Sequence, residues 1–156
     1  MKTAEGRVDG TGLRVAVVAS RFNRAVTDRL LAGALDALRQ HGVAADAVEV
    51  VRVPGAFELP LAAELLAAHG RLDAIVALGA VVKGETPHFD FIASWVVAEL
   101  GRQSVQHRLP IALGVLTTNT VEQGLARSGT GRGNKGFEAA VTALEMARLR
   151  QQLRNG

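Results

Sequence analysis

One stretch of the chain, residues 79–90, carries the residue types best suited to chemistry. Apolar, strand-like residues end there in a polar turn that contains Gly84, Thr86 and His88, and a helix is expected to begin near Asp90. A buried strand that delivers an amide-rich turn and an imidazole to one place is typical of active sites in α/β proteins. We therefore predict that His88 transfers protons in a site at this turn.

The positions of the other three histidines can be explained without a catalytic role. His41 and His69 each directly precede a glycine, and His107 lies three residues before Pro110. These are expected helix C-termini, where a polar or cationic side chain suits the free carbonyls and the helix dipole. His88 is the exception.

Polar turns also follow two other strand-like runs. The first is Ser-Arg-Phe-Asn at residues 20–23, and the second is Pro-Gly-Ala-Phe-Glu at residues 54–58. Phe22 offers a ring for stacking, although it could equally staple the following helix. Glu58 could accept hydrogen bonds from ligand hydroxyls or serve only as a first-turn helix carboxylate, and Phe57 could be helix packing.

A second cluster, residues 127–138, combines four glycines with three cations. Gly131-x-Gly133-x-x-Gly136 fits the dinucleotide pattern only formally, because no strand directly precedes it. Lys135 is followed by glycine rather than Ser or Thr, so the cluster is not a phosphate-loop NTPase motif. Its composition favours binding of a phosphate or carboxylate, and the alternative is a solvated surface turn.

Composition narrows the function classes. The 156 residues suit one domain, and 48% apolar with 21% charged residues is ordinary for a globular fold. The chain has no cysteine, which excludes disulfides and thiolate metal sites. We expect a cytoplasmic protein, because there is no signal segment and no membrane-spanning run.

Charge argues against a nucleic-acid surface. The net charge is +3 and aromatic residues make up 4%, so a basic stripe interleaved with stacking rings is not expected. Arg148, Arg150 and Arg154 are interpreted as the basic last turns of a helix.

The elements that would position these residues alternate between strand and helix. Apolar runs predict strands over 13–19, 47–53, 74–82 and 111–117, and helical spacing predicts helices over 24–41, 58–69, 90–107 and 134–153. Asn23 or Thr27 is expected to cap the first helix, and Trp95 to face inward from the third. The pattern predicts a three-layer α/β/α sandwich with a four-stranded parallel sheet over residues 13–156, preceded by an N-terminal arm over 1–12.

Five motifs in this order resemble the lumazine synthase family over residues 13–149. They are Ser-Arg-Phe-Asn at 20–23, Val-Pro-Gly-Ala-Phe-Glu-Leu-Pro at 53–60, Gly-x-Thr-x-His-Phe-Asp at 84–90, Gly-Val-Leu-Thr-Thr at 114–118 and Gly-Asn-Lys-Gly-x-Glu-Ala at 133–139. The resemblance implies a flavodoxin-like fold and a cofactor-independent transferase. That enzyme condenses 5-amino-6-(D-ribitylamino)uracil with 3,4-dihydroxy-2-butanone 4-phosphate, giving 6,7-dimethyl-8-ribityllumazine, phosphate and water.

The resemblance also implies roles for particular residues. His88 would move protons, Lys135 would steady the leaving phosphate, and Glu138 would steady His88. Phe22 would stack on the pyrimidine, and the amides of Glu85 and Thr86 with Arg127 would hold the phosphate. The implied substrate-binding positions are Phe22, Asn23, Ala56, Phe57, Glu58, Ala80, Val81, Val82, Glu85, Thr86, Leu113 and Arg127.

The family builds its site between subunits of a homopentamer, and some members assemble further into an icosahedral shell of sixty chains. Arg127 and Leu113 would then come from the adjacent chain. Leu113 departs from the phenylalanine of many relatives, which would remove an aromatic contact. The short turn at 131–133 resembles that of shell-forming members, and the arm could add to a neighbour's sheet edge.

Two other functions are compatible with such a fold. The chain could be an assembly protein or flavin carrier, since fold does not fix function. A flavodoxin-like mononucleotide binder would instead be a monomer that retains a flavin nucleotide on purification. The complete set of Phe22, Glu58, His88, Arg127 and Lys135 favours the enzyme.

Overall fold

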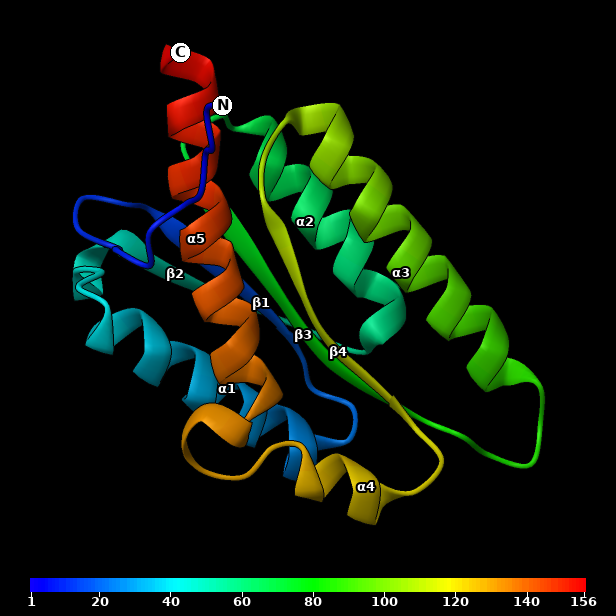
Figure 1. Ribbon diagram of the computed structural model, residues 1–156. Coiled ribbons are helices and arrows are strands. Elements are labelled where there is room, and N and C mark those ends of the chain that lie inside the picture. Colours follow the sequence, from blue (N-terminus) through cyan, green and yellow to red (C-terminus); the bar gives the residue numbers. More distant parts are fainter.

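A computed structural model, which describes all 156 residues, contains a four-stranded sheet of order β2-β1-β3-β4 (Figure 1). All three strand pairings are parallel. The strands are β1 (Val15–Ser20), β2 (Val48–Val53), β3 (Ala74–Val82) and β4 (Ile111–Thr118). The two central strands, β1 and β3, are buried on both faces, which explains their almost continuously apolar sequences. The predicted parallel sheet is confirmed.

Helices cover both faces of the sheet (Figure 1). The helices α1 (Arg24–Gln40) and α5 (Lys135–Asn155) pack on one face, and α2 (Leu59–Ala68) and α3 (His88–His107) on the other. Each face has its own apolar cluster, so the predicted three-layer sandwich is confirmed. None of the helices combines the length and hydropathy that crossing a membrane would need.

Four short elements lie outside the predicted set. They are the helix α4 (Val121–Ala126) and the single-turn 3-10 helices η1 (Ala45–Ala47), η2 (Ala56–Glu58) and η3 (Gly131–Gly133). Each has six residues or fewer, which is too short for a periodic apolar pattern to be visible in the sequence.

The starts of two helices differ from the prediction. His88 is the first residue of α3 and directly follows Pro87, so it belongs to the helix rather than to the preceding turn. Of the two residues predicted to cap α1, only Asn23 lies at the N-cap, and neither side chain makes a capping hydrogen bond. Asn23 occupies the N-cap position in a left-handed conformation (φ 62°), but its side-chain Nδ2 donates to the Ala80 carbonyl at 3.0 Å. Thr27 lies buried within the helix, and its hydroxyl has no partner in the chain.

The position of Trp95 on α3 also differs from the prediction. Val96 and Leu100 are buried, whereas Trp95 leaves 42% of its surface exposed. The prediction for Trp95 is wrong because this side chain lies against the η2 turn rather than over the sheet.

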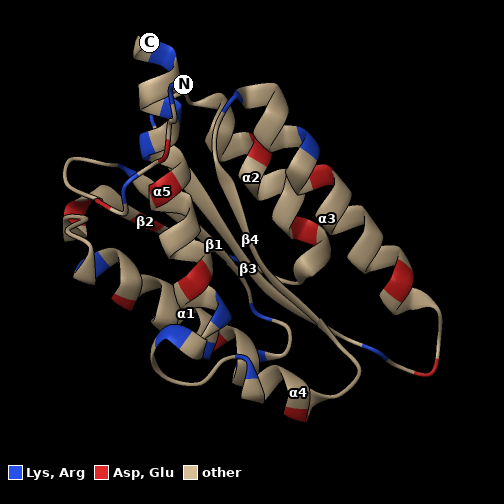
Figure 2. Cartoon of the chain, viewed as in Figure 1, with Lys and Arg blue, Asp and Glu red and all other residues tan.

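The N-terminal arm runs along α5 of its own chain (Figure 1). Gln152 Nε2 donates to the Glu5 carbonyl at 3.0 Å, and Arg148 Nε donates to the Asp9 carbonyl at 2.8 Å. Figure 2 shows basic residues, coloured blue, along this end of α5. Arg148 therefore binds the arm in addition to lying near a helix end. Addition of the arm to a neighbour's sheet stays a prediction.

Candidate active site

A pocket of about 390 Å³ lies at the carboxyl ends of β1, β2 and β3. It is the place where ligands bind in open α/β sheets. Ten predicted site residues line it together: Phe22, Asn23, Ala56, Phe57, Glu58, Ala80, Val81, Val82, Thr86 and His88.

The turn after β1 is pinned at its backbone. The N–H of Arg21 donates to the Val53 carbonyl at 2.8 Å, and the N–H of Phe22 donates to the Pro54 carbonyl at 3.0 Å. Asn23 adds the side-chain bond to Ala80 at the end of β3. The Phe22 ring nevertheless remains 71% exposed, so it is not a staple for α1. An exposed ring on a fixed backbone suits stacking against a planar ligand.

The η2 turn supplies a carboxylate and a second ring. Glu58 Oε2 accepts a hydrogen bond from the Gly55 N–H at 2.9 Å, which closes the turn and leaves Oε1 without a partner in the chain. Glu58 is exposed and lines the pocket, so Oε1 can accept hydrogen bonds from a ligand. The Phe57 ring is 55% exposed and pairs with Trp95 at a centroid distance of 5.7 Å.

The start of α3 brings His88 and free backbone amides to the pocket. Its N-cap residue is Pro87, and no side chain caps the first turn. The first N–H groups of such a helix favour an anion. His88 is exposed and makes no hydrogen bond within the chain, so both ring nitrogens can face a ligand. Glu85 lies in the same exposed turn, between the lining residues Gly84 and Thr86.

Four of the predicted residues lie away from this pocket. Leu113, Lys135 and Glu138 line a separate hollow of about 270 Å³ beside β4 and α5. Lys135 Nζ and Glu138 Oε2 are 2.8 Å apart and form an ion pair there. Arg127, the C-cap residue of α4, lines neither hollow. Contact between Glu138 and His88 would therefore need a second chain.

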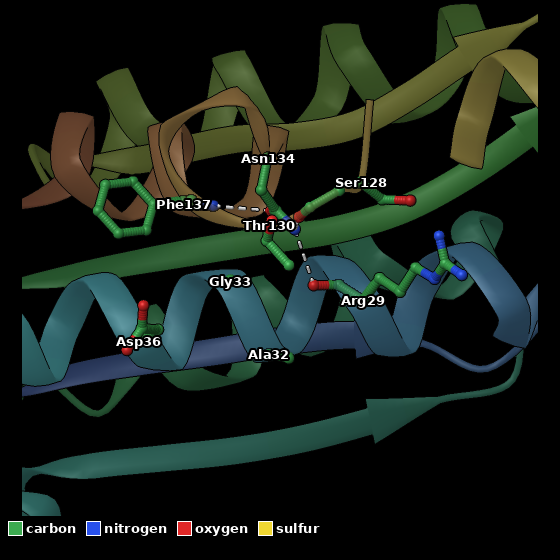
Figure 3. Close-up of a pocket in the computed structure, with 10 residues that line it drawn as sticks. Arg29, Ala32, Gly33, Asp36, Ser128, Thr130, Asn134 and Phe137 are labelled. Carbon is green, nitrogen blue, oxygen red and sulfur yellow. Dashed lines mark hydrogen bonds between the residues drawn. The ribbon is translucent and has the colours of Figure 1, made fainter. Parts of the chain in front are cut away.

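The glycine-rich loop before α5 forms part of a third hollow, of about 560 Å³, against α1 (Figure 3). Asn134 is 2% exposed, and its Oδ1 accepts from the N–H groups of Gly136 and Phe137 at 2.8 and 3.0 Å. Its Nδ2 donates to the Arg29 carbonyl at 3.0 Å. The first amides of α5 are thus already bonded. The guanidinium of Arg29 points away from Asn134 (Figure 3), and Asp36 adds a negative charge, so this hollow is poorly suited to the predicted anion.

The residue beside the site that sequence reasoning missed is Trp95. It is the only tryptophan in the chain, and this was the one feature of the sequence that could have marked the residue for attention. Helical periodicity assigned it to the core, whereas its indole Nε1 donates to the Phe57 carbonyl at 3.4 Å. The chain has no group of three or more His, Asp or Glu side chains placed to hold a metal ion.

Comparison with known families gives a match that covers the whole pocket. A family model described as 6,7-dimethyl-8-ribityllumazine synthase matches residues 12–151, which is most of the chain. The matched region includes every residue that lines the pocket as well as Leu113, Arg127, Lys135 and Glu138. The resemblance found in the sequence motifs is therefore confirmed.

Proposed function

Because the chain belongs to the lumazine synthase family, we propose that the pocket at the ends of β1, β2 and β3 is its catalytic site. Members of this family form 6,7-dimethyl-8-ribityllumazine in riboflavin biosynthesis, and this chain is an enzyme of that family. The single observation that carries the proposal is the convergence, on one pocket of about 390 Å³, of ten residues that the family resemblance assigns to the site. That volume suits a small-molecule substrate.

The pyrimidine substrate, 5-amino-6-(D-ribitylamino)uracil, is proposed to lie between the first and third strand ends. Phe22 provides the stacking ring, and the backbone from Ala80 to Val82 provides donors and acceptors for the edge of the uracil. The ribityl hydroxyls are proposed to bind the η2 turn, where Glu58 Oε1 is free. Phe22 and Glu58 are exposed, whereas Ala80 and Val81 are buried lining residues that would contribute backbone groups only.

The second substrate, 3,4-dihydroxy-2-butanone 4-phosphate, is proposed to place its phosphate at the uncapped start of α3. The amides of Glu85 and Thr86 would bind it there, beside His88. The amine of the pyrimidine attacks the ketone carbon, and the carbonyl oxygen leaves as water once protonated. A proton then leaves the adjacent carbon, the phosphate departs as its C–O bond breaks, and the resulting enol becomes a ketone. The ribityl-bearing nitrogen attacks that ketone carbon, and loss of its oxygen as a second water closes the ring. His88 is proposed to carry the protons in these steps.

Leu113, Arg127, Lys135 and Glu138 are proposed to complete the pocket of a neighbouring copy in a homopentamer. Their distance from the pocket within one chain supports sharing of the site. Exposed apolar side chains on α2 and α3, among them Leu61 and Leu65, support a subunit interface. We further propose that the pentamers assemble into an icosahedral shell, because the turn Gly131–Gly133 is short. We also propose that the enzyme acts in the cytoplasm, since it belongs to a biosynthetic family.

The first experiment follows lumazine formation from the two substrates against a protein-free control, because the condensation can proceed unaided. Acceleration supports the proposal. No acceleration by folded protein would instead favour a flavin carrier or assembly protein. A monomer that retains a flavin nucleotide would favour the mononucleotide binder.

A mixing experiment tests whether the site is shared. His88→Ala and Arg127→Ala are unfolded together and refolded at equal amounts, alongside each variant alone. Activity is measured at butanone phosphate well below KM, where each variant alone is impaired. If the site lies between copies, about a quarter of the sites in mixed assemblies regain both native residues, and activity recovers to about that fraction. No recovery in assemblies of the native size would contradict site sharing.

A further inference from the structure

Trp95 makes an unusual pair of contacts for a half-exposed side chain. Its indole N–H donates to the Phe57 carbonyl at 3.4 Å, and its ring lies 5.7 Å from the Phe57 ring with an interplanar angle of 32°. An exposed indole N–H could bond to water at no cost. The protein instead directs the donor and the ring at the same residue of the η2 turn.

We infer that Trp95 is a positioning residue for the pyrimidine substrate, acting through the η2 turn. This inference rests on the proposed function, in which the η2 turn holds the ribityl chain. Trp95 does not line the pocket itself, whereas Ala56, Phe57 and Glu58 do. The hydrogen bond and the ring contact of Trp95 reach the pocket through Phe57, which lies between Ala56 and Glu58 in the turn.

The ends of the segment that carries the turn are held by other bonds. At its start, the Pro54 carbonyl accepts from the N–H of Phe22. At its end, the Pro60 carbonyl accepts from buried Gln103 Nε2 of α3 at 2.8 Å. One helical turn further along α3, His107 Nε2 lies 2.9 Å from Glu64 Oε2 of α2. The helix α3 thus braces α2 independently of Trp95.

The middle of the turn has fewer restraints. Two hydrogen bonds lie within the turn. The Gly55 N–H donates to Glu58 Oε2 at 2.9 Å, and the Glu58 N–H donates to the Gly55 carbonyl at 3.2 Å. They fix its shape but not its position relative to α3. The pair of contacts to Trp95 joins Phe57 to α3, so Trp95 sets where Phe57 and Glu58 stand at the pocket.

Kinetics of two variants test this role. Trp95→Phe keeps an aromatic ring against Phe57 but removes the donor, and we expect KM for the pyrimidine to rise about threefold. Trp95→Leu removes both contacts and should raise it about tenfold. In both, kcat and KM for the butanone phosphate should stay unchanged, because the start of α3 is not held by Trp95.

Phe91→Leu is the matched control. Phe91 is an exposed aromatic residue one turn earlier on α3, and it neither lines the pocket nor pairs with another ring. We expect its KM for the pyrimidine to equal that of the wild type. Size-exclusion chromatography of all variants follows the assembly, and Trp95→Phe remains informative if Trp95→Leu does not fold.

The single tryptophan also provides a spectroscopic test without turnover. Saturating lumazine product should change Trp95 emission in the wild type, because the product occupies the pocket against the η2 turn. Butanone phosphate alone should leave the emission unchanged. Trp95 emission that does not change when the lumazine product is added would overturn the inference.

The outcomes separate the inference from the function on which it rests. Failure of the wild type to form lumazine overturns the proposed function, and the inference with it. Wild-type activity with equal pyrimidine KM in all variants overturns the inference alone. A KM that rises only together with loss of the oligomer assigns Trp95 to a subunit interface instead.

Discussion

The starts of α3 and α5 are alike in the sequence and different in the structure. Each follows a polar, glycine-containing turn, and each turn was predicted to bind an anion. At α5 the buried Asn134 side chain accepts hydrogen bonds from two of the first amides, and Figure 3 draws the one from Phe137. At α3 the N-cap residue is Pro87, and no side chain takes the amides.

The difference separates a structural helix terminus from one available to substrate. Ordinary helix starts are capped by Ser, Thr, Asp or Asn, and capping contributes to stability. A start without a cap forgoes that stabilisation and keeps its donors for a ligand. Substitutions at the two termini should therefore act on different properties: turnover at α3 and stability at α5.

The largest expected effect is on turnover at the start of α3. His88→Ala should lower kcat about a hundredfold, the lower end of what general acid–base catalysis contributes, or about 2.7 kcal/mol. The melting temperature should not change, because His88 is exposed and unbonded. His69→Ala, at the exposed end of α2, is the matched control. An unchanged kcat would remove His88 from the catalytic role.

The next effect should appear in stability at the start of α5. Asn134→Ala loses the cap and the Nδ2 bonds to the Arg29 and Gly129 carbonyls. We expect a loss of about 2 kcal/mol in the free energy of unfolding and a melting temperature about 4–8 °C lower. Asn119→Ala, an exposed asparagine, is the control in thermal unfolding. A stable variant with poor phosphate affinity would instead restore the anion-binding interpretation of this loop.

Arg127 tests whether the segment between α4 and α5 supplies charge to the anion at α3. Arg127→Ala should raise KM for the butanone phosphate about tenfold, or about 1.4 kcal/mol, with little change in KM for the pyrimidine. Arg132→Ala removes a nearby exposed cation and should have a much smaller effect. Equal effects from the two arginines would indicate only a general electrostatic attraction.

A smaller effect is expected at β4. Leu113→Phe should lower KM for the pyrimidine about threefold, because an aromatic pair contributes roughly 0.5–1.5 kcal/mol beyond its buried area. Leu113 is half-exposed, so the larger ring can be accommodated. Steady-state kinetics with the pyrimidine varied is the measurement, and an unchanged KM would place Leu113 away from the substrate.

The smallest effect concerns the far end of α5, where the arm is bound. Hydrogen bonds from the Thr11 backbone and side chain, with the charge of Arg148, lower the pKa of Asp9. A lowered pKa in the folded state means that this contribution is present above the ordinary Asp value near 3.8 and is lost as the pH falls below it. The protection of the arm amides from hydrogen exchange, taken relative to the intrinsic exchange rate at each pH, should therefore fall below about pH 4, and this acid-dependent step should be absent in Asp9→Asn.

Much of the fold was predictable because its determinants are local. The run from Ala74 to Val82 is apolar throughout, and its predicted strand has the observed bounds. Buried Val26, Leu30 and Leu38 follow the 3.6-residue period that predicted the inner face of α1. The pocket could also be located from local sequence, because polar turns directly follow three of the strands.

The remaining features depend on contacts between distant segments. Residue types alone do not indicate that Asn134 reaches across to the Arg29 carbonyl, or that Trp95 turns toward Phe57. The side of β4 on which Leu113 stands depends on how α5 packs beside it. Sequence reasoning therefore named residues that share the pocket but could not place the ion pair of Lys135 and Glu138 away from His88.

The Asn134 side chain also has a consequence for the order of folding. Its bond to Arg29 joins residues 105 positions apart, and α1 and α5 approach so closely there that a Cβ on Gly136 would lie 2.0 Å from the Leu30 carbonyl oxygen. We expect such a long loop to close only after the intervening strands are in place, so that the cap forms after the rate-limiting step. Removal of the cap should speed unfolding while leaving the refolding rate almost unchanged.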